Sequence, residues 1–290
     1  MKLQKLISKL EKHHKKKLDL SLGRTFNLLK KLGDPQDKLK NVITVVGTNA
    51  KASMCYSLKS ILNQGGYKTN LYTSPHLLSY TERYVFEDKE INEEDLIELL
   101  TDVEKTLGDD NATLFEILTC AFLKYAENFK DNINIIEAGL FHQFDSTNVF
   151  KENLMTLIGV IHNDHFQWLE NKSIEGVIYE KTAKLLNSNI FINKQVNNEI
   201  RDKIEKSLEK NTSNKYFFGK DFNIAKSENG FIQYQDQLGE LVLPNPSILG
   251  DHQLYNISTS IAASRKIFNV KDEYIKNGIK NISLKARLEE

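Results

Sequence analysis

Short apolar runs alternate with helical patterns along most of the chain. Residues 42–46 (VITVV) are apolar or β-branched throughout, which is typical of a strand buried on both faces of a parallel sheet. The polar segment GTNAKAS follows, and residues 55–62 then show the apolar spacing of a helix that ends at Gly65-Gly66. A second strand is predicted at residues 69–72 (TNLY). The first unit therefore reads strand, polar loop, helix, strand.

The same alternation continues over the rest of the chain. We predict further helices at residues 93–107, 113–129, 173–186 and 251–268, and further strands at residues 133–136, 156–161 and 190–192. Apolar residues at helical spacing from Leu3 to Leu10 predict an amphipathic N-terminal helix. Short strands separated by Gly and Asn between residues 215 and 243 predict an antiparallel patch. Together these patterns indicate an α/β fold, with a mostly parallel sheet flanked by helices and a small antiparallel β patch.

Polar segments follow four of the predicted strands directly. They read GTNAKAS, TSPH, EAG and HNDH. The carboxyl ends of parallel strands meet at one edge of a sheet, and ligands of such sheets bind beyond that edge. The sequence therefore predicts a ligand site built from these four segments.

Composition narrows the class of protein. The 290 residues include 39 Lys+Arg and 39 Asp+Glu, and this balance argues against a general nucleic-acid binder. No apolar run approaches the length of a membrane span, and the basic N-terminus lacks the apolar core of a secretory signal. Two cysteines fit a reducing compartment, so we expect a cytoplasmic protein without membrane or nucleic-acid partners. We expect the basic run at residues 13–17 to be a solvated helix end.

The segment GTNAKAS has the context of a phosphate-binding loop. A strand, a Gly-containing turn with a lysine and a helix aim backbone N–H groups at phosphates. The strict motif has Gly six residues before the lysine and directly before it, where Val45 and Ala50 stand. The residue before the lysine often needs a left-handed conformation, which costs a residue other than Gly roughly 1–2 kcal/mol. The alternative is an ordinary strand-to-helix turn with a surface lysine.

The ordered set of segments resembles the folylpolyglutamate synthase/dihydrofolate synthase family of Mur-type ATP-dependent ligases. In that family the loop reads GTNGKGS, and YTSPHL and a NERI-like segment follow at similar spacing. The resemblance continues through IIEAGLFHQFDSTNV, HNDHFQWL, YEKTAKL, GDHQLYN and KARLE, which match the family's EVGLGGRLDATNV, LDH, REKAG, GxHQxxN and GRLE. It covers nearly the whole chain from Asn41 to Glu289.

The resemblance implies an ATP-dependent ligase that adds L-glutamate to dihydropteroate or a folate through an acyl phosphate. It also implies ATP and two Mg²⁺ ions as cofactors, a P-loop-type sheet, small-molecule substrates and a monomer. The ATP-binding region would span residues 1–288, and we expect the C-terminal glutamate-ligase domain of the family to be absent after residue 290.

The resemblance assigns roles residue by residue. ATP would contact the loop residues Gly47, Thr48, Asn49, Ala50, Lys51, Ala52 and Ser53, together with Asn256 and Arg287. Mg²⁺ would be held by Ser74, Glu137, His165 and Lys181, with Lys181 carbamoylated. The pteroate or folate would contact Pro75, His76 and Asp145, and the catalytic residues would be Lys51, His165 and Lys181.

Each assignment has a plainer alternative. Glu137 could be a surface cap at a strand end, His165 a hydrogen-bonded loop residue, and Lys181 a solvated lysine on an amphipathic helix. Cys55, near a helix N-terminus, could be reactive, but buried packing is the expected role. We expect Ala52 to be tolerated because it falls inside the helix.

The departures from the family pattern leave the function open in two ways. Ala50 and Ala52 replace the loop glycines, and residues 141–144 (FHQF) replace GGRL and so remove an arginine. One alternative is a non-catalytic or truncated relative that binds nucleotide or folate without turnover. The other is a different Mur-type amide ligase, although TSPHL and DSTNV favour the folate branch.

Overall fold

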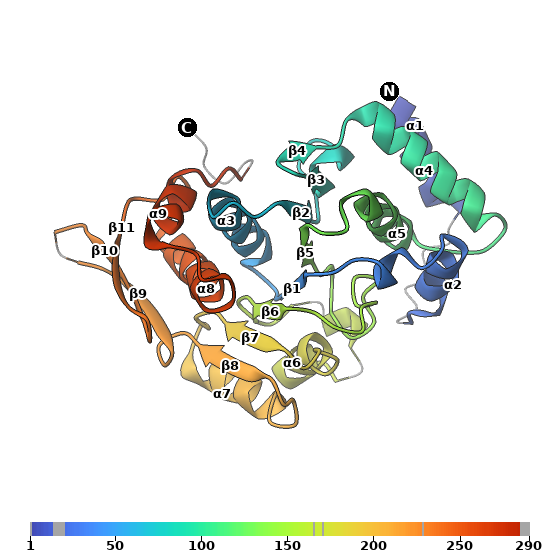
Figure 1. Cartoon of the computed structure of the whole chain (residues 1–290). Coiled ribbons are helices and arrows are strands. Elements are labelled where there is room, and N and C mark those ends of the chain that lie inside the picture. The colour runs from blue at the N-terminus through green and yellow to red at the C-terminus, as the bar shows by residue number, and fades with distance from the viewer. Residues whose placement is uncertain (1, 14–20, 165, 170, 228, 285–290) are drawn as a thin grey trace.

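A mixed eight-stranded sheet forms the centre of the protein (Figure 1). The computed structural model describes residues 2–13, 21–164, 166–169, 171–227 and 229–284. The strands are β1 (Val42–Val46), β2 (Thr69–Tyr72), β3 (Tyr84–Phe86), β4 (Lys89–Glu90), β5 (Ile133–Glu137), β6 (Met155–Ile158), β7 (Asn189–Ile192) and β8 (Asn214–Phe217). Their order is β4-β3-β2-β5-β1-β6-β7-β8, and the six strands from β2 to β8 in that order run parallel. β3 and β4 are antiparallel additions at one edge.

Helices cover both faces of this sheet. They are α1 (Lys2–His13), α2 (Gly23–Lys31), α3 (Lys51–Gln64), α4 (Glu93–Leu107), α5 (Leu114–Ala126), α6 (Ile174–Thr182), α7 (Asn198–Ser207), α8 (Asp251–Phe268) and α9 (Asp272–Lys280). Single 3-10 turns lie at Pro35–Asp37, Tyr80–Arg83, Glu127–Phe129 and Phe166–Trp168. A separate antiparallel sheet contains β9 (Phe222–Lys226), β10 (Ile232–Asp236) and β11 (Gly239–Leu243) in the order β11-β10-β9. It packs on the side of α8 (Figure 1).

The position of β1 at the centre of the sheet explains why its sequence is apolar or β-branched throughout. All five of its residues are buried, because helices cover both faces of the strand. Ile43 and Val45 face the core that contains α3, α8 and the small sheet. Val42 and Val46 face the opposite side, where they join the cores under α4–α5 and α6–α7 respectively. The strand therefore fixes the position of the loop that follows it between two packed layers.

Most of the predicted elements are confirmed. The strands at 42–46, 69–72, 133–136 and 190–192 and the helices at 93–107, 113–129 and 251–268 are present with small changes at their ends. The α/β class, the mostly parallel sheet and the antiparallel patch are also confirmed. Three helices (α2, α7, α9) and the short edge strands β3 and β4 were not predicted. The apolar patterns of the helices are interrupted by charged residues, and the two strands are only three and two residues long.

Three predicted boundaries were wrong. The strand at 156–161 ends at Ile158, because the chain then leaves the sheet and the Val160 carbonyl turns toward the β1 loop. The helix at 173–186 spans only Ile174–Thr182. Residues 214–217 do not belong to the antiparallel patch; as β8 they pair parallel to β7 in the main sheet.

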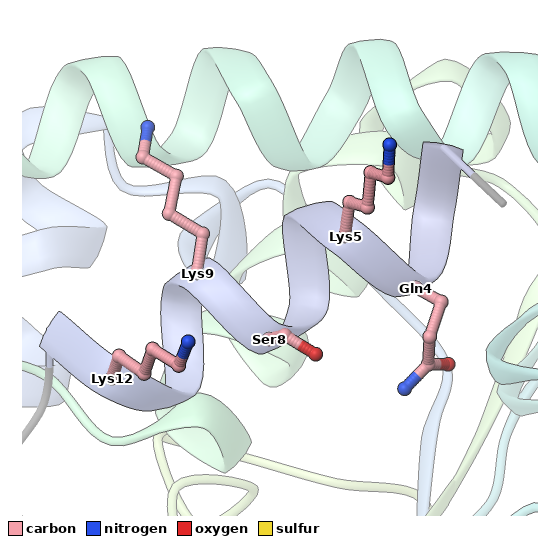
Figure 2. Close-up of a pocket in the computed structure, with 5 residues that line it drawn as sticks. All are labelled: Gln4, Lys5, Ser8, Lys9 and Lys12. Atoms are coloured by element: carbon pink, nitrogen blue, oxygen red, sulfur yellow. The ribbon is translucent and has the colours of Figure 1, made fainter.

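The N-terminal helix α1 is amphipathic, as predicted. Leu3, Ile7 and Leu10 are buried in the core shared with α4 and α5. Figure 2 shows its outer face, where Lys5, Lys9 and Lys12 with Gln4 and Ser8 line a shallow hollow. Lys9 Nζ lies 2.9 Å from Glu104 Oε2 of α4. The basic run at residues 13–17 lies almost entirely outside the described residues.

The helices that the structure describes include no candidate for a membrane-spanning segment. None of them combines the length and the apolar content needed to cross a membrane.

Candidate functional site

The loop between β1 and α3 has the backbone geometry predicted for a phosphate loop. Ala50 lies in the left-handed region (φ 72°, ψ −12°) directly before the first helical residue, Lys51. The prediction of a left-handed residue before the lysine is confirmed, although the residue is Ala instead of Gly. Ala52 lies inside the first turn of α3, where its side chain causes no backbone conflict. The amides of residues 50–53 precede the first helical hydrogen bond, from Met54 N to Ala50 O, and point out of the helix N-terminus.

The first half of the loop rests on the segment that follows β6. The amides of Thr48 and Asn49 both donate to the Val160 carbonyl, at 2.8 and 3.1 Å. Thr48 Oγ1 and the His162 backbone are also in contact at 3.4 Å, and Asn49 Nδ2 lies 2.7 Å from His162 Nε2. The N–H groups of Thr48 and Asn49 therefore already donate to a backbone carbonyl. Residues 50–53 provide N–H groups that can bind an anion.

Lys51 is folded back over this loop. Its Nζ donates to the carbonyls of Gly47 (3.2 Å) and Thr48 (3.3 Å) and lies 4.0 Å from Glu137 Oε1. Its side chain is only 14% exposed. The alternative of a surface lysine on an ordinary turn does not describe this arrangement, because the ammonium group lies over the loop beside a buried carboxylate.

Glu137 ends β5, directly beside β1 in the sheet. It pairs with Val45 in the register of the two strands, and it is only 3% exposed. Its Oε2 accepts a hydrogen bond of 3.0 Å from the backbone N–H of Ser74, which follows β2. The alternative of a surface cap is therefore wrong, and the segments GTNAKAS, TSPH and EAG meet at one edge of the sheet as predicted.

Lys181 reaches the same loop from the other side. It lies on α6, is 2% exposed, and donates to the carbonyls of Gly47 (3.0 Å) and Leu140 (2.8 Å). Burial, with a further contribution from the positive charge of Lys51, lowers the pKa of Lys181 to about 7. The expectation of a solvated lysine is wrong here, since α6 turns this position toward the sheet. Two lysines thus converge on one carbonyl oxygen, that of Gly47.

Asp145 is buried next to this cluster. Its Oδ1 accepts from the backbone N–H (3.0 Å) and the hydroxyl (2.6 Å) of Thr147, and its Oδ2 accepts from Gly139 N at 3.0 Å. Burial raises the pKa of Asp145, while those hydrogen bonds act in the opposite direction. A Cβ at Gly139 would lie 2.7 Å from the Phe115 ring and 2.8 Å from Asp145 Oδ2, so the backbone here has no room for a side chain.

His76 and Pro75 lie at the outer edge of the site. His76 Nδ1 accepts a 2.9 Å hydrogen bond from Arg83 Nε, and its ring centroid lies 4.0 Å from that of Tyr80. Partial burial, followed by the charge of Arg83, lowers the pKa of His76. Pro75 is exposed and joined to Ser74 by a cis peptide bond.

Asn256 lies on α8 and is 4% exposed. Its Oδ1 accepts from Asn193 Nδ2 at 2.8 Å, and its Nδ2 donates to Gln253 Oε1 at 2.9 Å. α8 packs along α3, and Ser260 Oγ donates to the Met54 carbonyl at 3.1 Å. Asn256 therefore lies on the helix that packs along α3, the helix that begins at Lys51.

Two predicted site residues, His165 and Arg287, lie outside the described residues. Among the residues that are described, no group of three or more His, Cys, Asp or Glu side chains is placed to hold a metal ion. The Glu137 carboxylate and the Ser74 hydroxyl nevertheless fit Mg²⁺, which takes oxygen ligands and is usually bound by one or two carboxylates together with phosphates.

Cys55 and His142, whose side-chain types are often reactive in proteins, are both buried here. Cys55 is fully buried, and burial raises the pKa of its thiol, so the packing role expected from the sequence is confirmed. His142, from the FHQF segment, is 3% exposed, and burial with the charge of Lys181 lowers its pKa to about 4. It is neutral at physiological pH.

Sequence reasoning missed several residues that shape the site. Asn193 and Gln195 are buried and follow β7. His162 belongs to the predicted segment HNDH, but its contact with Asn49 was not predicted. The available signal was the polar segment NKQ directly after the apolar strand NIFI, at a strand end facing the same edge as the other polar segments.

The chain is similar along most of its length to proteins named dihydrofolate synthase or folylpolyglutamate synthase. It is 28% identical to the dihydrofolate synthase/folylpolyglutamate synthase of Bacillus subtilis over 286 residues, which cover 92% of this chain and 65% of the relative. It is also 28% identical to the probable dihydrofolate synthetase of Schizosaccharomyces pombe, covering 94% of this chain and 66% of the relative. The Escherichia coli dihydrofolate synthase/folylpolyglutamate synthase is 35% identical over 163 residues, or 56% of this chain and 38% of the relative. No family model matches the chain.

Solved structures show the same fold. E. coli FolC in complex with DHPP and ADP superimposes with a TM-score of 0.87 at 27% identity, covering 99% of this chain and 67% of FolC. The apo form of L. casei FPGS gives a TM-score of 0.88 at 23% identity, covering all of this chain and 74% of that protein.

The similarity thus includes nearly all of this chain and only part of each relative. The chain spans 65% and 66% of the lengths of the B. subtilis and S. pombe proteins. Sequence similarity along the chain and a shared fold agree with the ordered motifs around Lys51, Glu137 and Lys181. The chain is therefore similar to dihydrofolate synthase/folylpolyglutamate synthases in sequence along nearly its whole length, and it shares their fold.

Proposed function

We propose that this chain carries the nucleotide- and pteroate-binding part of an ATP-dependent ligase that joins L-glutamate to dihydropteroate or a folate. The observation that carries the proposal is the convergence of Lys51 and Lys181 on the Gly47 carbonyl, at the N-terminus of α3 and beside Glu137. The substrate class comes from the relatives, which are named for dihydrofolate and folylpolyglutamate synthesis.

The charges of the site suit a reaction between two anions. ATP and a carboxylate repel each other, so the protein must supply positive charge where they meet. Lys51, the amides of residues 50–53 and the positive end of the α3 dipole would bind the β- and γ-phosphates. The substrate carboxylate would attack the γ-phosphorus with ADP leaving, and the glutamate amine would then attack the acyl carbon with phosphate leaving.

Magnesium is the cofactor that the donor atoms fit. Glu137 and Ser74 would hold Mg²⁺ together with phosphate oxygens, and His165 and Lys181 complete the proposed ligand set of two ions. When bound, Mg²⁺ would neutralise charge on the phosphates. A pKa near 7 gives Lys181 a substantial neutral fraction, and a neutral amine can add CO2 with loss of a proton to become a carbamate.

The remaining predicted residues line the proposed ends of the substrates. Asp145, with Pro75 and His76, would contact the pteroate or folate, and Asn256 and Arg287 would contact the nucleotide. The assignment of Asp145 rests on the resemblance of DSTNV to the family's DATNV, and its buried carboxylate accepts from Gly139 N. We propose that residues 1–288 form the ATP-binding region, and that glutamate ligation needs the further length that the relatives possess.

Acyl phosphate formation tests this proposal on the chain itself. Purified protein with Mg-ATP, dihydropteroate and hydroxylamine should release ADP and yield the hydroxamate, which traps the acyl phosphate before any glutamate is needed. Lys51→Ala should lower the rate by about 100-fold or more, since it removes a charged partner of the phosphates. Lys40→Ala, an exposed lysine before β1, is the matched control and should have the wild-type rate. Failure of the wild-type chain to bind Mg-ATP at millimolar concentration would exclude the nucleotide site.

A second candidate is a relative that binds nucleotide or folate without turnover. The observation that favours it is Ala50, which holds a left-handed conformation that costs a residue other than Gly roughly 1–2 kcal/mol. Tight Mg-ATP binding without hydroxamate formation, even in an Ala50→Gly variant, would support this candidate over the ligase.

A further inference from the structure

The phosphate loop is supported by two buried amide side chains that follow β7. Asn193 and Gln195 are 2% and 8% exposed, and neither belongs to the predicted site. Buried amides need hydrogen-bond partners, and the partners that they choose fix the geometry of the backbone around them. Here those partners lead from the loop to Asn256.

Gln195 grips the segment on which the loop rests. Its Oε1 accepts from Ile161 N at 3.0 Å, and its Nε2 donates to the carbonyls of Gly159 (3.1 Å) and Asn193 (2.8 Å). Both amide protons and one oxygen lone pair are thus used. The residue between its two anchors is Val160, whose carbonyl accepts the amides of Thr48 and Asn49.

Gly159 makes this contact close. A Cβ at this position would lie 2.4 Å from the Asn49 carbonyl oxygen and 3.1 Å from Met54 Cε. The loop therefore lies directly against the segment that Gln195 holds, and a displacement of residues 159–161 would displace Thr48 and Asn49 with it.

Asn193 continues the chain of hydrogen bonds toward α8. Its Oδ1 accepts from Lys194 N at 2.7 Å, and its Nδ2 donates to Asn256 Oδ1 at 2.8 Å. Asn256 then donates to Gln253 Oε1 at 2.9 Å, which decides how its amide is oriented. One continuous set of contacts joins the phosphate loop, the ends of β6 and β7, and Asn256.

We propose that Gln195 is a positioning residue for nucleotide binding, which sets the phosphate loop relative to Asn256 on α8. This inference rests on the proposed nucleotide site, because Asn256 and the loop are its two proposed contacts. The loop has an intrinsic tendency to leave its conformation, since Ala50 is left-handed without being Gly. The bonds from Thr48 and Asn49 to Val160 oppose that tendency, and Gln195 holds Val160 in place.

The test compares binding of two ligands by the full chain. Gln195→Glu keeps the size of the side chain and the acceptor for Ile161 N, and it loses both donors to carbonyl oxygens. We expect the Kd for Mg-ATP to rise about 10- to 100-fold, which corresponds to the loss of one or two buried hydrogen bonds. The Kd for dihydropteroate should change less than 3-fold. Gln233→Glu, on the exposed face of β10, is the matched control and should leave both constants unchanged.

Three outcomes separate the possibilities. If Gln195→Glu raises the Kd for Mg-ATP and for dihydropteroate equally, Gln195 has only a structural role. A lower melting temperature with both Kd values unchanged would mean the same. Wild-type affinity of Gln195→Glu for Mg-ATP would overturn the inference while the proposed function stands. A wild-type chain that fails to bind Mg-ATP would overturn the proposed function first.

Two further variants keep the inference testable if Gln195→Glu does not fold. Asn193→Ala cuts the link to Asn256 but keeps the carbonyl that Gln195 uses, so it should raise the Kd for Mg-ATP by about 5- to 30-fold. Adding Ala50→Gly should reduce the loss caused by either variant several-fold, because a relaxed loop needs less support. Strict additivity of Ala50→Gly with the Asn193 and Gln195 variants would contradict the inference.

Discussion

Lysines of α1 and the lysines beside the phosphate loop differ in how far they are exposed to solvent. Lys9 of α1 has a side chain that is 56% exposed, and its ammonium group pairs with Glu104 across the helix surface. Lys181 is 2% exposed and bonds to two backbone carbonyls, and burial lowers its pKa to about 7. The comparison teaches that chemistry at pH 7 depends on where the fold places a lysine, since only the buried one can readily lose its proton.

The largest expected effect comes from removing the buried lysine. Lys181→Ala removes the donor to Gly47 O and Leu140 O and leaves a cavity beside the loop. We expect hydroxamate formation to fall by at least about 100-fold, measured at saturating Mg-ATP. Lys184→Ala, an exposed lysine three residues later, should retain activity. Comparable losses in the two variants would show that burial does not distinguish these lysines.

The pH dependence of stability should also separate the two kinds of lysine. The pKa of Lys181 is lowered from 10.5 to about 7 on folding, so the unfolded chain binds more protons between these values. The contribution of Lys181 to the free energy of unfolding is therefore complete above pH 10.5 and is lost as the pH falls toward 7. The slope is at most about 1.4 kcal/mol per pH unit.

Urea unfolding between pH 7 and 9.5 measures this slope. The wild-type chain should become more stable as the pH rises, whereas Lys181→Met should have a flatter profile. Lys9→Met is the control for an exposed lysine and should follow the wild type. A wild-type profile that is flat, or that falls with pH in the same way for all three proteins, would refute the buried titration.

Glycine substitutions in the loop before α3 should change the free energy of unfolding in opposite directions at residues 50 and 52. Ala50→Gly should raise the free energy of unfolding by about 1 kcal/mol, because Gly adopts the left-handed conformation without a steric penalty. Ala52→Gly, two residues later and inside α3, should lower it by about 1 kcal/mol, as Gly does in helix interiors. The opposite signs make the pair a sharp test, and effects of the same sign in both variants would count against the assigned conformation.

The smallest expected effect belongs to the surface pair. Lys9→Ala removes an ion pair in which the lysine is more than half exposed, so the free energy of unfolding should fall by no more than about 0.5 kcal/mol. Raising the salt concentration should erase even that difference. A loss above 1 kcal/mol would mean that the exposed lysine is as tightly integrated as Lys181.

Local sequence patterns predicted a large part of this fold. β1 was recognisable because its five residues are all apolar or β-branched, as a strand covered on both faces requires, and α3 because its apolar positions repeat at helical spacing. The left-handed residue before Lys51 also followed from the position of the lysine alone. In contrast, the end of β6 was placed three residues too late, because residues 159–161 are apolar enough for a strand but leave the sheet to support the loop.

The sequence by itself determined the order of the long strands and helices, the loop before Lys51, and the set of polar segments at strand ends. These features depend on neighbours within a few residues along the chain, so the local sequence is sufficient to predict them. Only the tertiary structure decided that Lys181 meets Gly47, which lies 134 residues earlier, and that Gln195 holds the support of the loop. The order of parallel strands and the rotation of α6 about its axis create these contacts, and both depend on packing between distant segments.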